Sequence, residues 1–386
     1  MQAIYAYQQA QSSDYELAQD LIKSNFEPDL NAMEKQDKIL LKKEAQIALQ
    51  IFDKSYQQKQ VITHTEANTK INHSVQRAID FYYKSLQKDY NFYLKEMLAE
   101  VDNIYNHYLA ILLWAVEISN IIATQRDKKS INPNHIKIAA EYQIADNRII
   151  KIIADNEKFR EFLLRKSISW HEEQDLLLDF VGKLKKNEKY QEYAQKEATL
   201  ESDWEILDYI FREYLFKKTP EDSPEEEKDL QAFFEKKDIN WSENREILKS
   251  MILKTLKKAK ESPQNFELLE LSQDWEADSD FFENLYKNTL SEIPRYEELL
   301  SKIAKNWKTE RFVMLDKILI QMAIAEMLYC PSIPIKVTIN EYIELAKNYS
   351  TPKSKNFING MLNTLAEELH QQSLIKKTGR GLLDNQ

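Results

Sequence analysis

The residue types that carry most enzyme chemistry are present in this chain, but their spacing forms no catalytic pattern. Six histidines are scattered along the sequence, and His171-Glu172-Glu173 lacks the spacing of a zinc protease, which places two histidines one helical turn apart. Cys330 is the only cysteine, which excludes an internal disulfide and a multi-cysteine zinc site. Gly182-Lys183 lacks the upstream glycine and the Ser or Thr of a phosphate-binding loop. We therefore expect no catalytic residue, no metal and no cofactor.

The composition predicts an all-α protein. The 386 residues include 4 glycines and 9 prolines, too few for the frequent turns of a β fold, and helix-favouring Leu, Ile, Lys, Glu, Gln and Ala dominate. The hydrophobic share of 43% supports a sizeable core, and the length allows roughly two or three domains. A single cysteine fits a reducing cytoplasm.

We expect a cytoplasmic protein that does not enter a membrane. The most apolar stretch, from Tyr108 to Ile122, contains Glu117 and is shorter than the roughly 20 residues that a membrane-spanning helix needs. The opening residues lack the charged lead and apolar run of a signal peptide. The net charge is −10, and the acidic run over residues 221–227 is typical of a solvated loop.

Helical periodicity organises the first two thirds of the chain. Apolar residues recur at steps of three and four over residues 76–126 and predict one long helix there. Shorter helices are predicted over residues 1–11 and around 39–51. The triplet Asn132-Pro133-Asn134 breaks the long helix, since proline cannot continue it, and more helix is predicted over about 135–155.

Two segments of the middle region echo each other. Residues 160–186 and 231–258 share Phe, Lys, Ile, Trp and Glu at matching positions, including Trp170 and Trp241. Each segment ends in an apolar helix whose last residue is lysine, over residues 176–186 and 247–258. We interpret them as two similar helix–turn–helix units, each with its tryptophan at the turn. Two copies are too few for a solenoid, which needs at least three, and a chance match is the alternative.

The last hundred residues predict four further helices. Two are predicted over 295–307 and 311–327. The next begins either at Pro334, which suits a first helical turn, or at a capping box formed by Thr338 and Glu341. The last begins with Thr351 as its cap and Pro352 at its first position. The residues after 372 are predicted to form a flexible tail.

Several uncommon motifs occur together in this closing part: PIKVTINEYIELAK over residues 334–347 and FING over 357–360, with LDKIL at 315–319 and AIAEM at 323–327 upstream. Together they resemble the NusB family of bacterial transcription antitermination factors. The opening QAIYAY at residues 2–7 resembles the family's first helix. The resemblance implies an all-α bundle formed by the chain ends, residues 1–12 and 280–372. Residues 13–279 would be a large helical insertion, and residues 373–386 the tail.

The resemblance also implies partners and site residues. NusB proteins bind boxA-type RNA together with NusE, a small-subunit ribosomal protein, within an RNA polymerase antitermination complex that serves ribosomal RNA operons. By position in the motifs, the implied RNA-binding residues are Gln2, Tyr5, Tyr349, Lys353 and Lys355. Stacking by tyrosine and phosphate contacts by lysine suit single-stranded RNA. The alternative is a solvated turn without RNA contact for the last three, and Gln2 and Tyr5 have the same alternative of no RNA contact.

Further positions of the motifs have structural or partner interpretations. Asp316 and Lys317 match the region that meets NusE. Asn340 and Glu341 are expected either to cap or tie helices or to contact a partner. Phe357 is expected in the core, and Asn359-Gly360 is expected to mark close packing, because glycine inside a helix costs about 1 kcal/mol relative to alanine.

The chain departs from the family pattern in two ways. It lacks the arginine-rich segment that normally precedes the first helix, so we expect Met1 to be an internal methionine of a longer product. Lys353 stands where many members have an acidic residue, which adds a positive charge beside the implied RNA path.

Two alternatives to a NusB-type antitermination factor remain. An RNA methyltransferase with a NusB-like domain would need a cofactor-binding α/β domain after the match, where only about 20 residues follow. A helical scaffold that has kept the fold and lost RNA binding is the alternative from another class.

Overall fold

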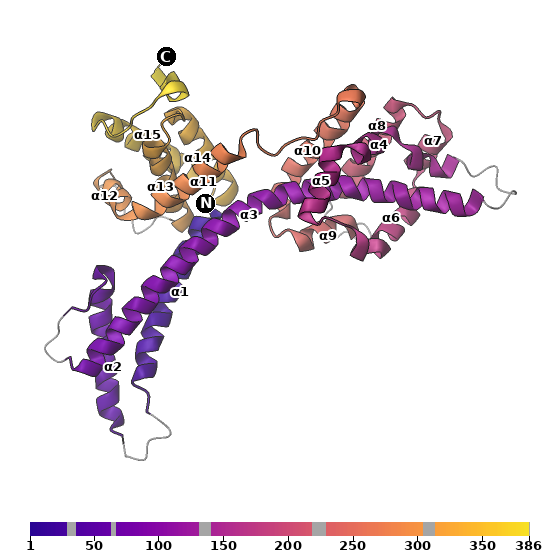
Figure 1. Ribbon diagram of the computed structural model, residues 1–386. Helices are drawn as coiled ribbons and strands as arrows, with labels where there is room; N and C mark the ends of the chain where they lie inside the picture. Colours follow the sequence, from indigo (N-terminus) through magenta and orange to yellow (C-terminus); the bar gives the residue numbers. More distant parts are fainter. Residues whose placement is uncertain (29–35, 63–66, 131–139, 218–228, 304–312, 386) are drawn as a thin grey trace. The chain divides into compact units, whose positions relative to one another are not determined.

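The computed structural model describes residues 1–28, 36–62, 67–130, 140–217, 229–303 and 313–385, and over these ranges the chain forms α-helices and short helical turns without strands. The all-α prediction is confirmed. The chain divides into two compact units, residues 1–99 with 274–386 and residues 100–273 (Figure 1). The long helix α3 (Thr69–Ser130) contributes its first half to one unit and its second half to the other.

The first unit contains both chain ends. Besides the start of α3, its helices are α1 (Gln2–Asn25), α2 (Lys38–Ser55), α11 (Trp275–Ser291), α12 (Ile293–Ile303), α13 (Met314–Tyr329), α14 (Ile335–Tyr349), α15 (Ser354–Gln371) and the short 3₁₀ helix η10 (Gly379–Asn385).

A bundle of α11 to α15 forms the larger core of this unit. The central helix is α13, which is buried on every side from Ile318 to Met327, as expected for a helix surrounded by others. Ile4 of α1 is buried in the same core, and the Gln9 side-chain amide contacts the sulfur of Met314 at 3.0 Å. The opening helix therefore packs on the closing helices, and the prediction of a bundle formed by the chain ends is confirmed.

A second, smaller core joins α1, α2 and the start of α3. Ala18, Ile22, Ala48 and Phe52 are completely buried in it. Asp37 caps α2 by accepting hydrogen bonds from the amides of Ile39 and Leu40. This packing explains why α1 extends to Asn25, so the predicted end near residue 11 was wrong.

The second unit is built from the end of α3 and many short helices. They are the 3₁₀ helices η3 (Ala140–Asp146), η4 (His171–Glu173) and η7 (Pro263–Asn265), the π-helix η5 (Phe211–Leu215), and the α-helices α4 (Arg148–Asp155), α5 (Glu157–Lys166), α6 (Gln174–Lys186), α7 (Glu188–Gln195), α8 (Leu200–Ile210), α9 (Asp229–Lys237) and α10 (Trp241–Glu261). Side-chain caps start four of the short α-helices: Asn147, Asn156, Asn187 and Thr199.

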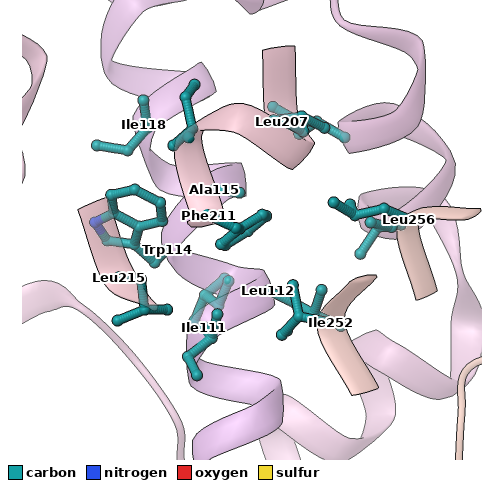
Figure 2. Packing of buried hydrophobic residues seen from close by; sticks show 14 of the residues in the cluster. Ile111, Leu112, Trp114, Ala115, Ile118, Leu207, Phe211, Leu215, Ile252 and Leu256 are labelled. Atoms are coloured by element: carbon teal, nitrogen blue, oxygen red, sulfur yellow. The ribbon is translucent and has the colours of Figure 1, made fainter. Parts of the chain in front are cut away.

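The end of α3 is the centre of this unit's core. Figure 2 shows Trp114 and its neighbours on α3 facing Leu207, Phe211 and Leu256. Trp114 meets Phe180 at 4.6 Å and Phe211 at 5.8 Å between ring centroids, within the range of favourable aromatic pairs.

The two echoing segments meet in this core through their aromatic residues. Trp170 and Trp241 are both buried. The ring of Trp170 lies 4.8 Å from that of Phe233, and Trp241 stacks on Phe234 at 5.1 Å. The Trp170 indole also donates a hydrogen bond to the Ala110 carbonyl of α3. That the two segments are repeats of one unit stays a prediction.

Several predicted helix ends were wrong. Of the helix expected over 135–155, residues 135–139 lie outside the described residues, residues 140–146 form η3, and the α-helix α4 begins at Arg148. The capping box at Thr338 was wrong, since α14 begins directly after Pro334. The last helix begins at Ser354 with Lys353 at its N-cap position, not at Thr351. The Asn132-Pro133-Asn134 break and the acidic run over 221–227 lie outside the described residues.

By length and composition, one helix among the described residues, over Thr69–Lys128, is long and apolar enough to cross a membrane. More than half of its most apolar window is buried inside the protein. A core helix of a water-soluble domain meets the same criteria, so this is weak evidence for a membrane span.

Candidate nucleic-acid interface

The turn between α14 and α15 carries three of the residues that the motifs single out. Tyr349 is the last residue of α14 and is half-buried. Lys353 and Lys355 flank the start of α15 and are exposed. The structure thus brings one aromatic ring and two ammonium groups together over seven residues of chain. Such a combination suits a nucleotide, whose base stacks and whose phosphate is negative.

A buried carboxylate holds this turn in place. Asp316, in the first turn of α13, is 5% exposed. Its two oxygens accept hydrogen bonds from the hydroxyls of Ser350 at 2.5 Å and Ser354 at 2.8 Å. The Thr351 hydroxyl lies 2.8 Å from that of Ser354 and extends the network. The turn is therefore fixed to the start of α13 by charge-assisted hydrogen bonds, which are about twice as strong as neutral ones.

The electrostatics of the turn favour an anion. A helix N-terminus presents unpaired amides and a partial positive charge. Lysine at the N-cap position of α15 cannot accept a hydrogen bond from these amides, unlike the serine or aspartate that commonly stands there. Lys353 and Lys355 add two positive charges at the same end of the helix. An incoming phosphate would meet amide donors and cations together.

Gln2 and Tyr5 lie on the first turns of α1, within the same unit. Gln2 is exposed, and Tyr5 keeps 39% of its surface exposed. Ile4, between them, is buried in the bundle core and so fixes which face of α1 these two side chains occupy. Their RNA-binding role stays a prediction.

The two residues assigned to NusE contact differ in exposure. Asp316 is buried and its carboxylate already accepts two hydrogen bonds, which makes it the anchor of the turn. Lys317 remains 40% exposed and pairs with Glu297 of α12 at 2.5 Å. Partner contact by these residues stays a prediction, and the geometry makes Lys317 the more accessible of the two.

A second buried carboxylate lies near the other end of α13. Glu326 is 6% exposed and accepts hydrogen bonds from Thr338 at 2.7 Å and Tyr342 at 3.1 Å, both on α14. Burial raises the pKa of Glu326, and the two hydrogen bonds oppose that shift. The motifs did not mark Glu326 as a residue that joins helices, although it is the only charged residue between Ile318 and Met327.

Other interpretations of the motifs changed. Asn340 and Glu341 are exposed in the interior of α14, so neither caps a helix. Phe357 packs against the bundle core as expected. The close-packing interpretation of Gly360 was wrong, because a Cβ added there would meet nothing within 4 Å. Gly360 and Asn359 lie on the exposed face of α15.

Among the described residues, no group of three or more His, Cys, Asp or Glu side chains could hold a metal ion. Burial raises the pKa of the Cys330 thiol to about 11, which keeps it protonated and poorly nucleophilic at neutral pH.

Comparison with known proteins points in the same direction as the motifs. The model of the NusB family matches residues 237–367. Proteins named "Transcription antitermination protein NusB" are 41% identical over 104 residues in Salinibacter ruber and 42% over 105 residues in Chloroherpeton thalassium. The Bacillus subtilis protein of that name is 35% identical over 105 residues.

Each match covers 27% of this chain. The matched residues make up 65%, 50% and 80% of the three relatives, respectively, so the chain spans less than two thirds of the first two. No solved structure matches.

Proposed function

Because the chain belongs to the NusB family, we propose that it is a cytoplasmic RNA-binding antitermination factor rather than an enzyme. In this proposal it binds boxA-type single-stranded RNA jointly with NusE. The complex would then join RNA polymerase and help it to read through terminators, chiefly in ribosomal RNA operons. The relatives' names supply the antitermination role, and the α14–α15 turn supplies the RNA contacts.

The observation that carries the proposal is the anchored turn. The turn offers the Tyr349 ring for stacking on a base and the ammonium groups of Lys353 and Lys355 for binding phosphate. Asp316 fixes the backbone that carries these side chains. A rigid presentation lowers the entropy lost on binding. Gln2 and Tyr5 would extend the same RNA path over the first turns of α1.

Lys317 and the neighbouring part of α12 around Glu297 would form the NusE side of the complex. Lys317 is accessible there and lies next in sequence to the anchoring carboxylate. One short segment of α13 would thereby position both surfaces. The net charge of −10 makes joint binding reasonable, because an acidic protein attracts RNA weakly at long range and gains from a second RNA-binding partner.

A gel-shift titration with boxA RNA, with and without NusE, tests this proposal. Tyr349→Ala should weaken binding by about 1–3 kcal/mol if its ring stacks on a base. The double variant Lys353→Gln with Lys355→Gln should lower the salt dependence by about 0.7 in log–log slope for each phosphate that these lysines no longer neutralise. Lys287→Gln removes an exposed lysine from α11 of the same bundle and serves as the matched control.

The net acidity also supports one other function, a NusB-fold scaffold that has lost RNA binding. The same titration separates the two. Absence of boxA binding both with and without NusE would favour the scaffold, and equal affinities for the turn variants and the Lys287→Gln control would reject the turn as the binding site.

A further inference from the structure

The segment that follows α15 contains two of the chain's four glycines, Gly379 and Gly381. Gly379 has a φ of +53°, a left-handed conformation that side chains disfavour. Gly381 is buried, and a Cβ built on it would lie 2.1 Å from the Pro331 carbonyl oxygen. By contrast, a Cβ on Gly182 or Gly360 would meet nothing within 4 Å. The segment therefore approaches Pro331 at a distance that only glycine permits.

Directed hydrogen bonds accompany this close approach. The Thr378 amide donates to the Pro331 carbonyl at 2.9 Å, and the Lys377 ammonium donates to the Cys330 carbonyl at 3.0 Å. Cys330 is the C-cap of α13. The last carbonyls of a helix lack intrahelical donors and carry a partial negative charge, so a lysine there is doubly favourable. The Gly381 amide donates back to the Thr378 carbonyl and closes the turn.

The corner that these contacts cover joins α13 to α14 and lies close to buried Glu326. The Lys377 ammonium is near enough to oppose the effect of burial, which raises the pKa of Glu326. The same charge also acts on the Cys330 thiol. Burial and the Glu326 carboxylate raise the pKa of this thiol, and the Lys377 ammonium lowers it. The segment thus supplies a cation near a carboxylate that accepts hydrogen bonds from the hydroxyls of Thr338 and Tyr342.

We propose that residues 374–383 are a strap that docks as one unit on the α13–α14 corner, with Gly381 as its fitted contact and Lys377 as its charged contact. When docked, it covers the corner carbonyls of Cys330 and Pro331 and holds the angle between α13 and α14. When released, it exposes this corner while the bundle core stays folded. This inference is independent of RNA binding.

Hydrogen exchange followed by NMR on the full chain tests the strap. The Thr378 amide is the direct reporter, because its hydrogen bond to Pro331 exists only when the strap is docked. Leu362, completely buried in the bundle core, reports whether the bundle stays folded. In Gly381→Ala, Thr378 should exchange at least about tenfold faster, the loss expected for roughly one to two hydrogen bonds, and Leu362 should not change.

Matched substitutions separate the strap from general effects. Gly360→Ala changes a glycine in open space, and Lys376→Met removes an exposed lysine next to Lys377. Both should leave Thr378 exchange unchanged. Lys377→Met should accelerate it, and combined with Gly381→Ala it should add little, since one undocking event removes both contacts.

Two results would overturn the proposal. The first is a Thr378 amide that already exchanges in the unaltered protein at the rate of an unstructured peptide. The second is equal Thr378 exchange in Gly381→Ala and Gly360→Ala. If Gly381→Ala also accelerates Leu362, the milder Lys377→Met decides: faster exchange at Thr378 alone supports the strap, and no change there rejects it.

Discussion

The two ends of α14 are held by the same kind of hydrogen bonds but differ in what surrounds them. At each end a buried carboxylate of α13 accepts two hydroxyl hydrogen bonds: Asp316 from Ser350 and Ser354, and Glu326 from Thr338 and Tyr342. At the Asp316 end, the donors belong to the turn and exposed lysines surround them. At the Glu326 end, the donors are buried on α14 and the segment after α15 covers the corner.

The same arrangement, a buried carboxylate with two hydroxyl donors, can either hold a turn that exposes its neighbouring side chains or join two helices in the core. A carboxylate that binds a turn fixes the backbone and leaves neighbouring side chains to solvent. A carboxylate that binds the face of a helix fixes the angle between two helices and offers nothing to a ligand. The candidate site is therefore at the end of α14 where the donors come from a turn.

The largest expected effect comes from removing the turn's anchor. Asp316→Ala leaves the buried Ser354 hydroxyl and the half-buried Ser350 hydroxyl without their carboxylate acceptor, which should lower the free energy of unfolding by about 3 kcal/mol. Urea unfolding measures this decrease. Asp316→Asn keeps one acceptor oxygen and should be less destabilising. If Asp316→Ala proves as stable as the unaltered protein, the anchor is not what holds the turn.

At the closed end, Glu326 should make stability depend on pH. Its pKa in the folded protein is raised above the ordinary value of 4.5 by burial. The folded state therefore binds a proton more tightly than the unfolded state, and this contribution is complete below pH 4.5 and disappears as pH rises through the raised pKa. Unfolding free energies measured from pH 4 to pH 8 should fall more steeply in the unaltered protein than in Glu326→Gln. If the unfolding free energies of the unaltered protein and of Glu326→Gln changed in parallel with pH, Glu326 would not contribute to the pH dependence of stability, and this difference between the two ends of α14 would disappear.

A smaller effect of opposite sign is expected on the open face of α15. Gly360→Ala adds a methyl group where nothing lies within 4 Å and should stabilise the helix by about 1 kcal/mol. Gly182→Ala in α6 has the same open surroundings and should give a similar gain in thermal unfolding. Destabilisation by Gly360→Ala would restore the close-packing interpretation.

The smallest effect on stability is expected at Lys317. Its pair with Glu297 is substantially exposed on both sides, and such pairs contribute about 0–1 kcal/mol. Lys317→Gln should leave the unfolding curve nearly unchanged yet weaken NusE binding, measured by calorimetry, if this surface meets the partner as proposed. If the affinity for NusE is unchanged, the role of Lys317 would be limited to its ion pair with Glu297 of α12.

The sequence predicted the helical elements better than their ends and contacts. The periodicity of residues 76–126 predicted most of α3, because one continuous apolar stripe faces three cores in turn. It missed the extension of α1 past residue 11, where the stripe of Ala18 and Ile22 is weak in sequence and gains its meaning only against α2. The start of α15 was misplaced because Thr351 is a good cap by type, whereas its hydroxyl pairs with Ser354 at the Asp316 anchor.

The candidate site was predicted in part. The motifs placed Tyr349, Lys353 and Lys355 at one turn, and the structure places them there. They assigned Asp316 to a partner surface without revealing that it is buried. On a helix that is apolar on every side, periodicity cannot tell which face a lone acid occupies, so Asp316 and Glu326 could not be paired with their hydroxyl donors from spacing alone.

The sequence by itself determined that the chain is helical, which depends on local helix preference, and that it carries the NusB motifs, which are read directly from residue order. That the two chain ends form one bundle was implied only by the resemblance to the NusB family. Only the tertiary structure decided which polar groups are buried together and where the segment after α15 lies. Those outcomes depend on distances between residues far apart in sequence, such as the one between Pro331 and Gly381, and packing alone sets these.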